Sequence, residues 1–140
     1  MSSAKLMSDN REDYFSKVPC NGNLLLDPDT GLRLLEDEGS RRKRQSKYIY
    51  EDDLIKLVKA RPDFLTVIFD QSFSRGDARR KQLKRKVKSL HRNEVEAFAY
   101  ESHACFIIAG ANQDRVSEAK EKLLQNRSLL EKRIISLSDR

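Results

Sequence analysis

Nine of the residues from 75 to 92 are Lys or Arg, and Asp77 is the one acid among them. This segment therefore carries a net charge of +8, whereas the whole chain carries +6, so the remaining residues sum to −2. Such a concentration of positive charge is typical of a surface that meets phosphate groups or an acidic protein. The alternative is a solvated helix face, although like charges in so short a segment repel one another and cost stability. The residues expected to make these contacts are Arg75, Arg79, Arg80, Lys81, Lys84, Arg85, Lys88 and Arg92.

A helix over residues 77–91 is predicted to position these cations. Leu83, Val87 and Leu90 recur at i, i+4 and i+7, which places them on one narrow apolar stripe. The Lys and Arg residues spread over the remaining surface of this helix. The preceding segment, FLTVIFD at residues 64–70, is short, β-branched, aromatic and apolar at both parities, which predicts an inner strand.

Short elements alternate along the rest of the chain after residue 47. A helix is predicted at residues 50–60, strands at 94–101 and 103–109, a helix at 113–125 with Asn112 as its N-cap, and a last strand at 133–138. From residue 64 the order is therefore strand, helix, strand, strand, helix, strand. This order predicts an α+β fold of the ferredoxin-like plan, a four-stranded antiparallel sheet with two helices on one face.

The segment ACFIIAGANQDRVSEAKEKLLQNRSLLEKRIISLS begins with a strand, continues through a polar turn into a helix with an Ala-Lys centre, and ends in Leu-Leu-x-x-Arg-Ile-x-x-Leu. In this layout, residues 64–138 resemble a degenerate RNA recognition motif. Phe106 occupies the position of the second aromatic residue in the third-strand motif of that family. The resemblance implies an RNA-binding domain whose sheet aromatics stack on bases.

Strand alternation predicts which side chains lie on the open face of this sheet. In residues 94–101, Glu96 shares a parity with Phe98 and Tyr100, and the polar member directs that set outward. The same logic assigns Thr66 and Ile68 outward and leaves the core to Leu65, Val67 and Phe69. The expected open face carries Ile68, Phe98, Tyr100 and Phe106, with Ala104 and Ile108 beside them. Three uses of this face stay open: stacking on bases, contact with a protein partner, or cover by another segment of the chain.

Residues 1–47 lack sustained periodicity and are predicted to be a mostly disordered arm, followed by a short helix and linker at 48–62 and a domain at 63–140. A leucine island interrupts the arm, and it is expected either to dock on the domain or a partner, or to stay a mobile apolar patch. Its members are Leu24, Leu25, Leu26, Leu32, Leu34 and Leu35. The basic cluster Arg41, Arg42, Lys43 and Arg44 has the composition of a nuclear localisation signal.

Several classes of protein find no support in the sequence. No nucleophile motif, P-loop, dinucleotide-binding glycine pattern or pair of histidines predicts an enzyme. Cys20, Cys105, His91 and His103 lack metal-ligand spacing, so we expect no metal and no cofactor. No apolar run approaches the length of a membrane span, and MSSAKLMSDNRED has no secretory h-region. We therefore expect a protein of the nucleus or cytoplasm, or both, without a membrane partner.

Two functions are compatible with these features. The first is a non-enzymatic RNA-binding or ribonucleoprotein-assembly protein that uses the basic helix and a partly aromatic sheet face. The second is an adaptor whose domain, similar to an RNA recognition motif, binds a protein and not RNA. The charged segment favours the first function, and the incomplete aromatic motif favours the second.

Overall fold

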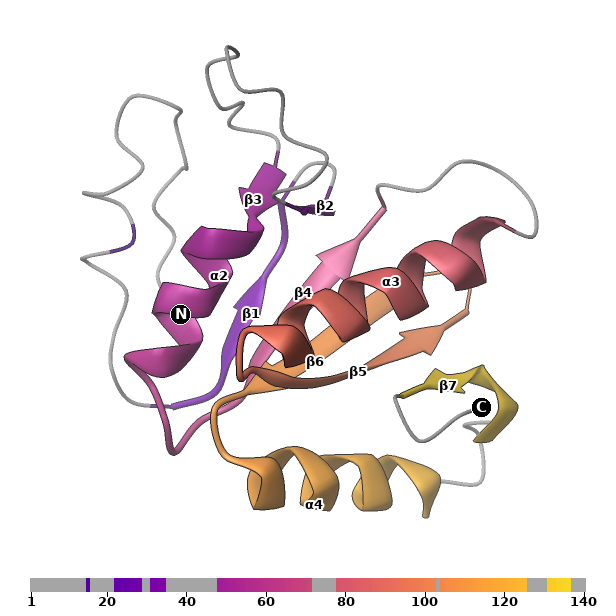
Figure 1. Cartoon of the computed structure of the whole chain (residues 1–140). Coiled ribbons are helices and arrows are strands. Elements are labelled where there is room, and N and C mark those ends of the chain that lie inside the picture. The colour runs from indigo at the N-terminus through magenta and orange to yellow at the C-terminus, as the bar shows by residue number, and fades with distance from the viewer. Residues whose placement is uncertain are drawn as a thin grey trace, which may run out of the picture.

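The computed structural model describes residues 15, 22–28, 31–34, 48–71, 78–102, 104–125 and 131–136. Figure 1 shows its elements in chain order. They are β1 (Leu24–Leu26), β2 (Gly31–Arg33), β3 (Tyr48–Tyr50), α2 (Glu51–Lys59), β4 (Thr66–Asp70), α3 (Ala78–Arg92), β5 (Glu96–Glu101), β6 (Cys105–Gly110), α4 (Gln113–Leu124), the 3₁₀ turn η2 (Glu131–Arg133) and β7 (Ile134–Ile135). The helices and inner strands thus fall within a few residues of their predicted positions.

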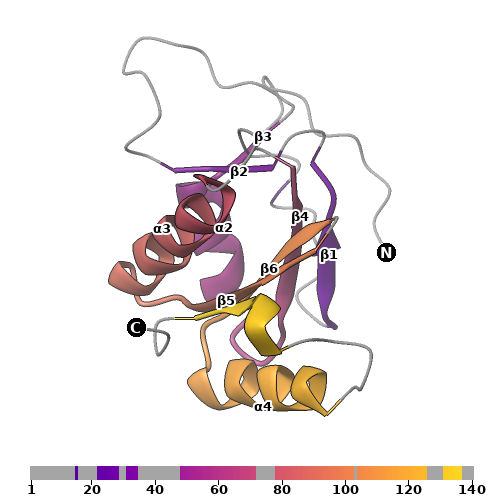
Figure 2. The ribbon, with the colours of Figure 1, turned by 90° about the vertical axis from the view of Figure 1, so that its right-hand side faces the viewer.

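The main sheet has five strands in the order β1-β4-β6-β5-β7, and β2 pairs with β3 in a separate two-stranded sheet at one side (Figure 2). β1 runs parallel to β4, and the other pairings in the main sheet are antiparallel. The described part of the chain is therefore an α+β fold with a mixed sheet. Its split β4-α3-β5 unit, with β6 between the two parallel strands, is the arrangement that a ferredoxin-like plan requires.

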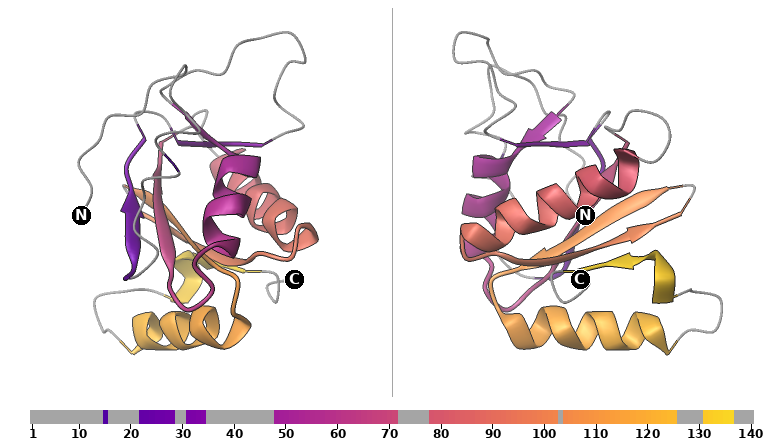
Figure 3. Two further views of the ribbon diagram at one scale, coloured as in Figure 1. Left: turned by 90° about the vertical axis from the view of Figure 1, so that its left-hand side faces the viewer. Right: turned by 45° about the vertical axis from the view of Figure 1, so that its right-hand side comes forward.

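The two faces of the main sheet are covered by different helices (Figure 3). Ile107 lies in one core with residues of α2 and α3, whereas its neighbour Ile108 lies in a second core with Val116 of α4. Successive residues of a strand point to opposite faces, so α3 and α4 lie on opposite sides of β6. This arrangement explains the continuous apolar runs of β4 and β6, since a strand that is covered on both faces needs apolar residues at both parities.

The predicted four-stranded arrangement with two helices on one face therefore differs from the observed one. The fourth strand of the predicted plan, β7, pairs with β5, at the edge opposite to the one the plan gives it. The edge beside β4 is occupied instead by β1, a segment of the predicted arm. α4 lies on the face of the sheet opposite to α3, where it covers Phe98 and Ile108.

α4 begins and packs as its local sequence indicates. The Oδ1 of Asn112 accepts hydrogen bonds from the backbone N–H of Asp114 at 2.9 Å and of Arg115 at 3.4 Å, which confirms the predicted N-cap. Gly110 precedes the helix at a tight contact, since a Cβ there would lie 2.9 Å from the Cγ2 of Val116. The absence of a side chain at residue 110 thus lets the first turn of α4 approach the sheet.

α3 is held on the sheet by apolar and polar contacts together. Leu83, Val87 and Leu90 are fully buried, as their spacing predicts. Lys86 is also buried, and its Nζ lies 2.7 Å from the Oδ2 of Asp70 at the end of β4. The Oγ of Ser89 donates a hydrogen bond to the Oε1 of Glu51, which ties α3 to the start of α2.

The leucine island docks on the domain, which is one of the two outcomes expected for it. Leu26, Leu32 and Leu34 are buried, and β1 is fastened to the segment before β4 by the side chain of Asn23. The Oδ1 of Asn23 accepts from the backbone N–H of Leu65 at 2.8 Å. The interpretation of residues 1–47 as a disordered arm is therefore wrong for the two strands; Leu35 and most of the arm lie outside the described residues.

Removal of one partner of the buried Asp70–Lys86 pair should destabilise the fold more than removal of both. Lys86→Met leaves the Asp70 carboxylate in a site that is almost closed to solvent, so we expect a loss of about 3–5 kcal/mol. The double variant Asp70→Leu and Lys86→Met leaves no uncompensated charge and should recover most of that loss. Urea unfolding monitored by circular dichroism measures both values. A double variant that is less stable than the single one would contradict the assignment of the pair as a buried charge pair.

Candidate functional site

The outer face of α3 carries a row of cations that we call the basic stripe: Arg80, Lys81, Lys84, Arg85, Lys88 and Arg92. Lys84 is half-exposed and the other five are exposed. The apolar residues of the helix face the sheet, so their 3.6-residue repeat turns the charged positions outward. Arg79 is half-exposed beside the stripe, and Arg75 lies outside the described residues.

Several members of the basic stripe have no neutralising partner nearby. Among the residues that the structure describes, no acidic side chain forms an ion pair with Lys81, Lys88 or Arg92. The first turn of α3 contains no acidic residue. Like charges spaced i, i+4, such as Lys81 with Arg85 and Lys88 with Arg92, each cost a few tenths of a kcal/mol. A polyanion that lay along the stripe would relieve this repulsion.

Lys86 is the one Lys or Arg of α3 that does not belong to the predicted set of contact residues. It points inward to Asp70. The signal that could have identified it is its position, since residue 86 lies one turn from Leu83 and Leu90 on the apolar side of the helix. A buried lysine then requires a buried acid, and Asp70 ends the only predicted inner strand that precedes the helix.

Several residues predicted on the open sheet face are instead buried. Ile68 is fully buried with the residues of α3, on the face opposite to the one expected, and Thr66 is buried on the same side. Phe98 does share a face with Tyr100 and Phe106, but α4 covers it and leaves it 1% exposed. The parity rule failed on β4 because both parities are apolar and each faces a helix-covered core. The sheet is therefore not an open platform of four aromatic and aliphatic side chains.

Three aromatic residues do line up across neighbouring strands on the α4 side, and we call them the aromatic row. Phe69 of β4 pairs in register with Phe106 of β6, which pairs in turn with Tyr100 of β5. The rings of Phe69 and Phe106 are tilted by 53° with centroids 5.2 Å apart. All three side chains are half-buried. The predicted residues Tyr100 and Phe106 are thus brought together, and Phe69, assigned to the core from sequence, joins them.

One residue farther along the strands, a polar row occupies the α3 side of the sheet. Asp70, Cys105 and Glu101 pair in register there. Burial raises the pKa of the Cys105 thiol above its ordinary value, and the nearby guanidinium of Arg79 only partly opposes this effect. The thiol is therefore protonated near neutral pH and is a poor nucleophile. Within the described part of the chain, no group of three or more His, Cys, Asp or Glu side chains is placed to hold a metal ion.

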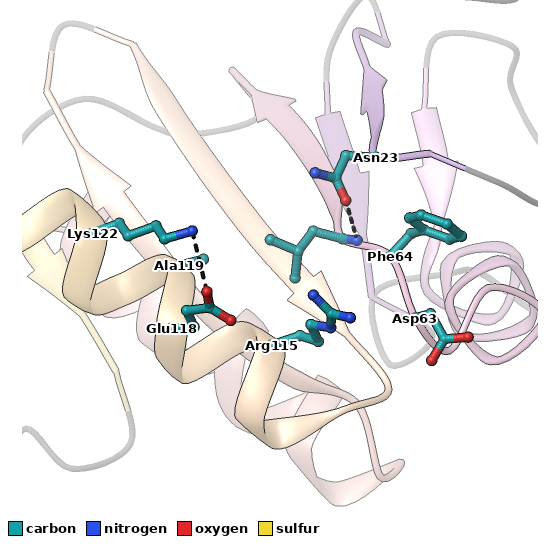
Figure 4. Close-up of a pocket in the computed structure, with 8 residues that line it drawn as sticks. Asn23, Asp63, Phe64, Arg115, Glu118, Ala119 and Lys122 are labelled. Atoms are coloured by element: carbon teal, nitrogen blue, oxygen red, sulfur yellow. Dashed lines mark hydrogen bonds and ion pairs between the residues drawn. The ribbon is translucent and has the colours of Figure 1, made fainter.

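A groove of about 530 Å³ lies at the opposite end of the sheet, between α4 and the segment that enters β4 (Figure 4). Its walls mix charges of both signs, and the Nζ of Lys122 lies 3.2 Å from the Oε1 of Glu118. Apolar lining comes from Phe64, Leu65 and Ala119, and the remaining polar lining comes from Asn23, Asp63 and Arg115. Because these charges nearly cancel, the groove does not extend the positive field of the basic stripe.

The remaining sequence predictions fall partly outside the described residues. The candidate nuclear localisation cluster, Arg41, Arg42, Lys43 and Arg44, lies there, as does His103. None of the helices that the structure describes is long and apolar enough to cross a membrane. Comparison with protein-family models, curated proteins and solved structures found no match to this chain. The likeness to the RNA recognition motif is therefore one of element order and of Phe106.

Truncation of Phe98 should destabilise the domain far more than truncation of Phe69. Phe98→Ala removes a ring that is fully enclosed by α4 and the sheet, so we expect a loss of about 3–5 kcal/mol. Phe69→Ala removes a half-buried ring at the sheet end and should cost about 1–2 kcal/mol. Chemical denaturation of the two variants measures the difference. Equal losses would show that the aromatic row is as buried as the core.

Proposed function

We propose that this protein binds RNA, alone or within a ribonucleoprotein assembly, and that the basic stripe of α3 is its principal contact. The observation that carries the proposal is the segregation of charge on one helix. Leu83, Val87 and Leu90 take the buried side, and six cations take the solvent side. A solvated helix surface usually mixes charges of both signs, whereas a surface that binds phosphates is cationic throughout.

The dimensions of the stripe suit an extended polyanion. From Arg80 to Arg92 the helix rises about 18 Å, at 1.5 Å per residue. Several phosphates of one strand can lie along this length, and each contact releases bound counterions. Affinity from this source is sensitive to salt and insensitive to base sequence. The basic stripe would therefore position the RNA without recognising its base sequence.

The aromatic row supports a secondary contact with bases. Aromatic side chains of nucleic-acid-binding proteins stack on unpaired bases of any identity, and Tyr100 and Phe106 retain partial exposure. Two features are shared with the RNA recognition motif, the order of elements and Phe106. The proposal departs from that family by placing the main contact on a helix and a smaller contact on the sheet.

A protein-binding adaptor is the second candidate function, and the α4 side of the sheet favours it. α4 packs on β5 and β6, while Leu25 of β1 is 46% exposed on the same side as half-buried Val67 and Phe69. Apolar side chains grouped at the edge of a sheet are a common feature of protein-contact surfaces. In this function the basic stripe would bind an acidic protein partner.

Neutralisation of the basic stripe should reduce the salt dependence of RNA binding. The triple variant Lys81→Gln, Lys88→Gln and Arg92→Gln changes cations that have no ion pair within the described residues, so the fold should be retained. Each phosphate contact contributes about −0.7 to the slope of log affinity against log salt for a single strand. The slope should therefore become less negative by about 2 or less. Fluorescence anisotropy with a labelled mixed-sequence single-stranded RNA across a salt series measures it.

A charge-matched control separates the effect of the basic stripe on the salt slope from the effect of net charge. The variant Lys56→Gln, Arg115→Gln and Lys122→Gln removes the same total charge from α2 and α4. Its slope should stay close to that of the unmodified protein. A stripe variant with an unchanged slope, or one that merely equals the control, would rule out α3 as the RNA contact.

The aromatic row should contribute to RNA binding through the ring of Phe106. Phe106→Leu keeps an apolar side chain but removes the π-face, so we expect RNA affinity to fall by about 1–3 kcal/mol. The stability should change by about 1 kcal/mol, because the substitution leaves the site filled. Anisotropy and a thermal melt on the same sample distinguish the two effects. Unchanged RNA affinity together with loss of a copurifying protein would favour the adaptor function.

A further inference from the structure

Four cations gather at one end of the main sheet, from elements about fifty positions apart in the chain. Arg79 and Arg80 belong to the first turns of α3, and Lys132 and Arg133 belong to η2. Figure 3 shows the start of α3, the β5–β6 turn and η2 at the same end of the sheet. We call these residues the sheet-end cluster.

Hydrogen bonds hold the cluster together and leave donors available. Nη1 of Arg80 donates to the backbone oxygen of Lys132 at 3.0 Å, and Nη1 of Arg133 donates to the backbone oxygen of Glu101 at 3.3 Å. Each guanidinium carries five N–H donors, so both arginines keep most of theirs. Nε of Arg79 lies 3.9 Å from the Oε2 of Glu101, which is a long contact between partly exposed groups.

The cluster lies between the two proposed RNA contacts. Arg80 is the first residue of the basic stripe on one face of the sheet. Tyr100, on the other face, is the residue before Glu101, which Arg79 and Arg133 contact. The rim of the sheet between the stripe and the aromatic row is thus lined by cations.

From this geometry we infer that the sheet-end cluster is a phosphate-binding clamp and that the ligand is a single strand. The strand follows the basic stripe with its backbone, turns around the sheet end at Arg80 and Lys132, and places unpaired bases on the aromatic row. This inference rests on the proposed RNA binding and adds to it the strand form and the path of the ligand.

A duplex does not fit this path. Duplexes are stiff on this scale, as the persistence length of DNA of about 150 base pairs illustrates, and they keep their bases stacked inside. A turn around one sheet end requires a bend within a few nucleotides. A single strand is flexible and exposes the faces of its bases to aromatic side chains. Arginine forks are suited to the phosphate at such a turn because they bind its oxygens in a bidentate manner.

A double-mutant cycle between the clamp and the aromatic row tests the path. The clamp variant is Arg80→Gln with Lys132→Gln, and the control is Lys88→Gln with Arg92→Gln at the far end of the same helix. Each is combined with Phe106→Leu and measured by anisotropy with a uridine-rich RNA of about 12 nucleotides. In the unmodified and control backgrounds Phe106→Leu should weaken binding by about 5- to 150-fold. In the clamp background its effect should shrink to about twofold, because the strand no longer reaches the row.

Two results would overturn the inference. One is an equal effect of Phe106→Leu in the clamp and control backgrounds, which would make the two sites independent. The other is binding of a duplex of about the same length as tightly as the single strand. Lys132→Gln alone serves as a second clamp variant, because its exposed side chain makes no hydrogen bond to described residues and its fold contact is through the backbone oxygen. Absence of any salt-dependent RNA binding by the unmodified protein would instead refute the proposed function itself.

Discussion

The packing of α3 on the main sheet is the interaction on which the rest of the structure depends. Burial of Leu83, Val87 and Leu90 contributes about 1.5–3 kcal/mol for each side chain. The repulsion between like charges on the outer face costs a few tenths of a kcal/mol for each i, i+4 pair. The apolar term therefore exceeds the electrostatic cost, and the helix can hold six cations on one side. The same packing places Lys86 against Asp70 and so fixes which cation points inward.

Cover on both faces of the sheet decides what the sheet can do. Because α3 and α4 lie on opposite sides, β4 and β6 are enclosed over most of their length. Among the described sheet residues, the aromatic row at one end and the strip near Leu25 at one edge retain partial exposure of apolar side chains. A sheet of this kind offers a small contact area compared with an open four-stranded platform. The proposed principal contact with RNA is therefore the cationic outer face of α3.

β1 shows how a short segment of the predicted arm changes the architecture. It occupies the edge next to β4, where the ferredoxin-like plan would put its last strand. The Asn23 side chain and the Leu24 backbone N–H both bond to Leu65 and set the parallel register. With that edge filled, β7 pairs with β5, and η2 comes to lie beside the start of α3. The position of the basic residues of η2 is therefore a consequence of strand order.

The sequence alone determined the features that depend on local periodicity and composition. These are the α+β class, the order of elements from residue 64, the Asn112 cap and the cationic face of α3, because each arises from contacts within one element. The tertiary structure decided the burial of Ile68 and Phe98, the pairing of Lys86 with Asp70 and the contact between Arg80 and Lys132. They depend on which element covers which face, and a strand that is apolar at both parities carries no local sign of that choice. For this chain, side-chain periodicity set what each element could bury, and strand order set what was left exposed.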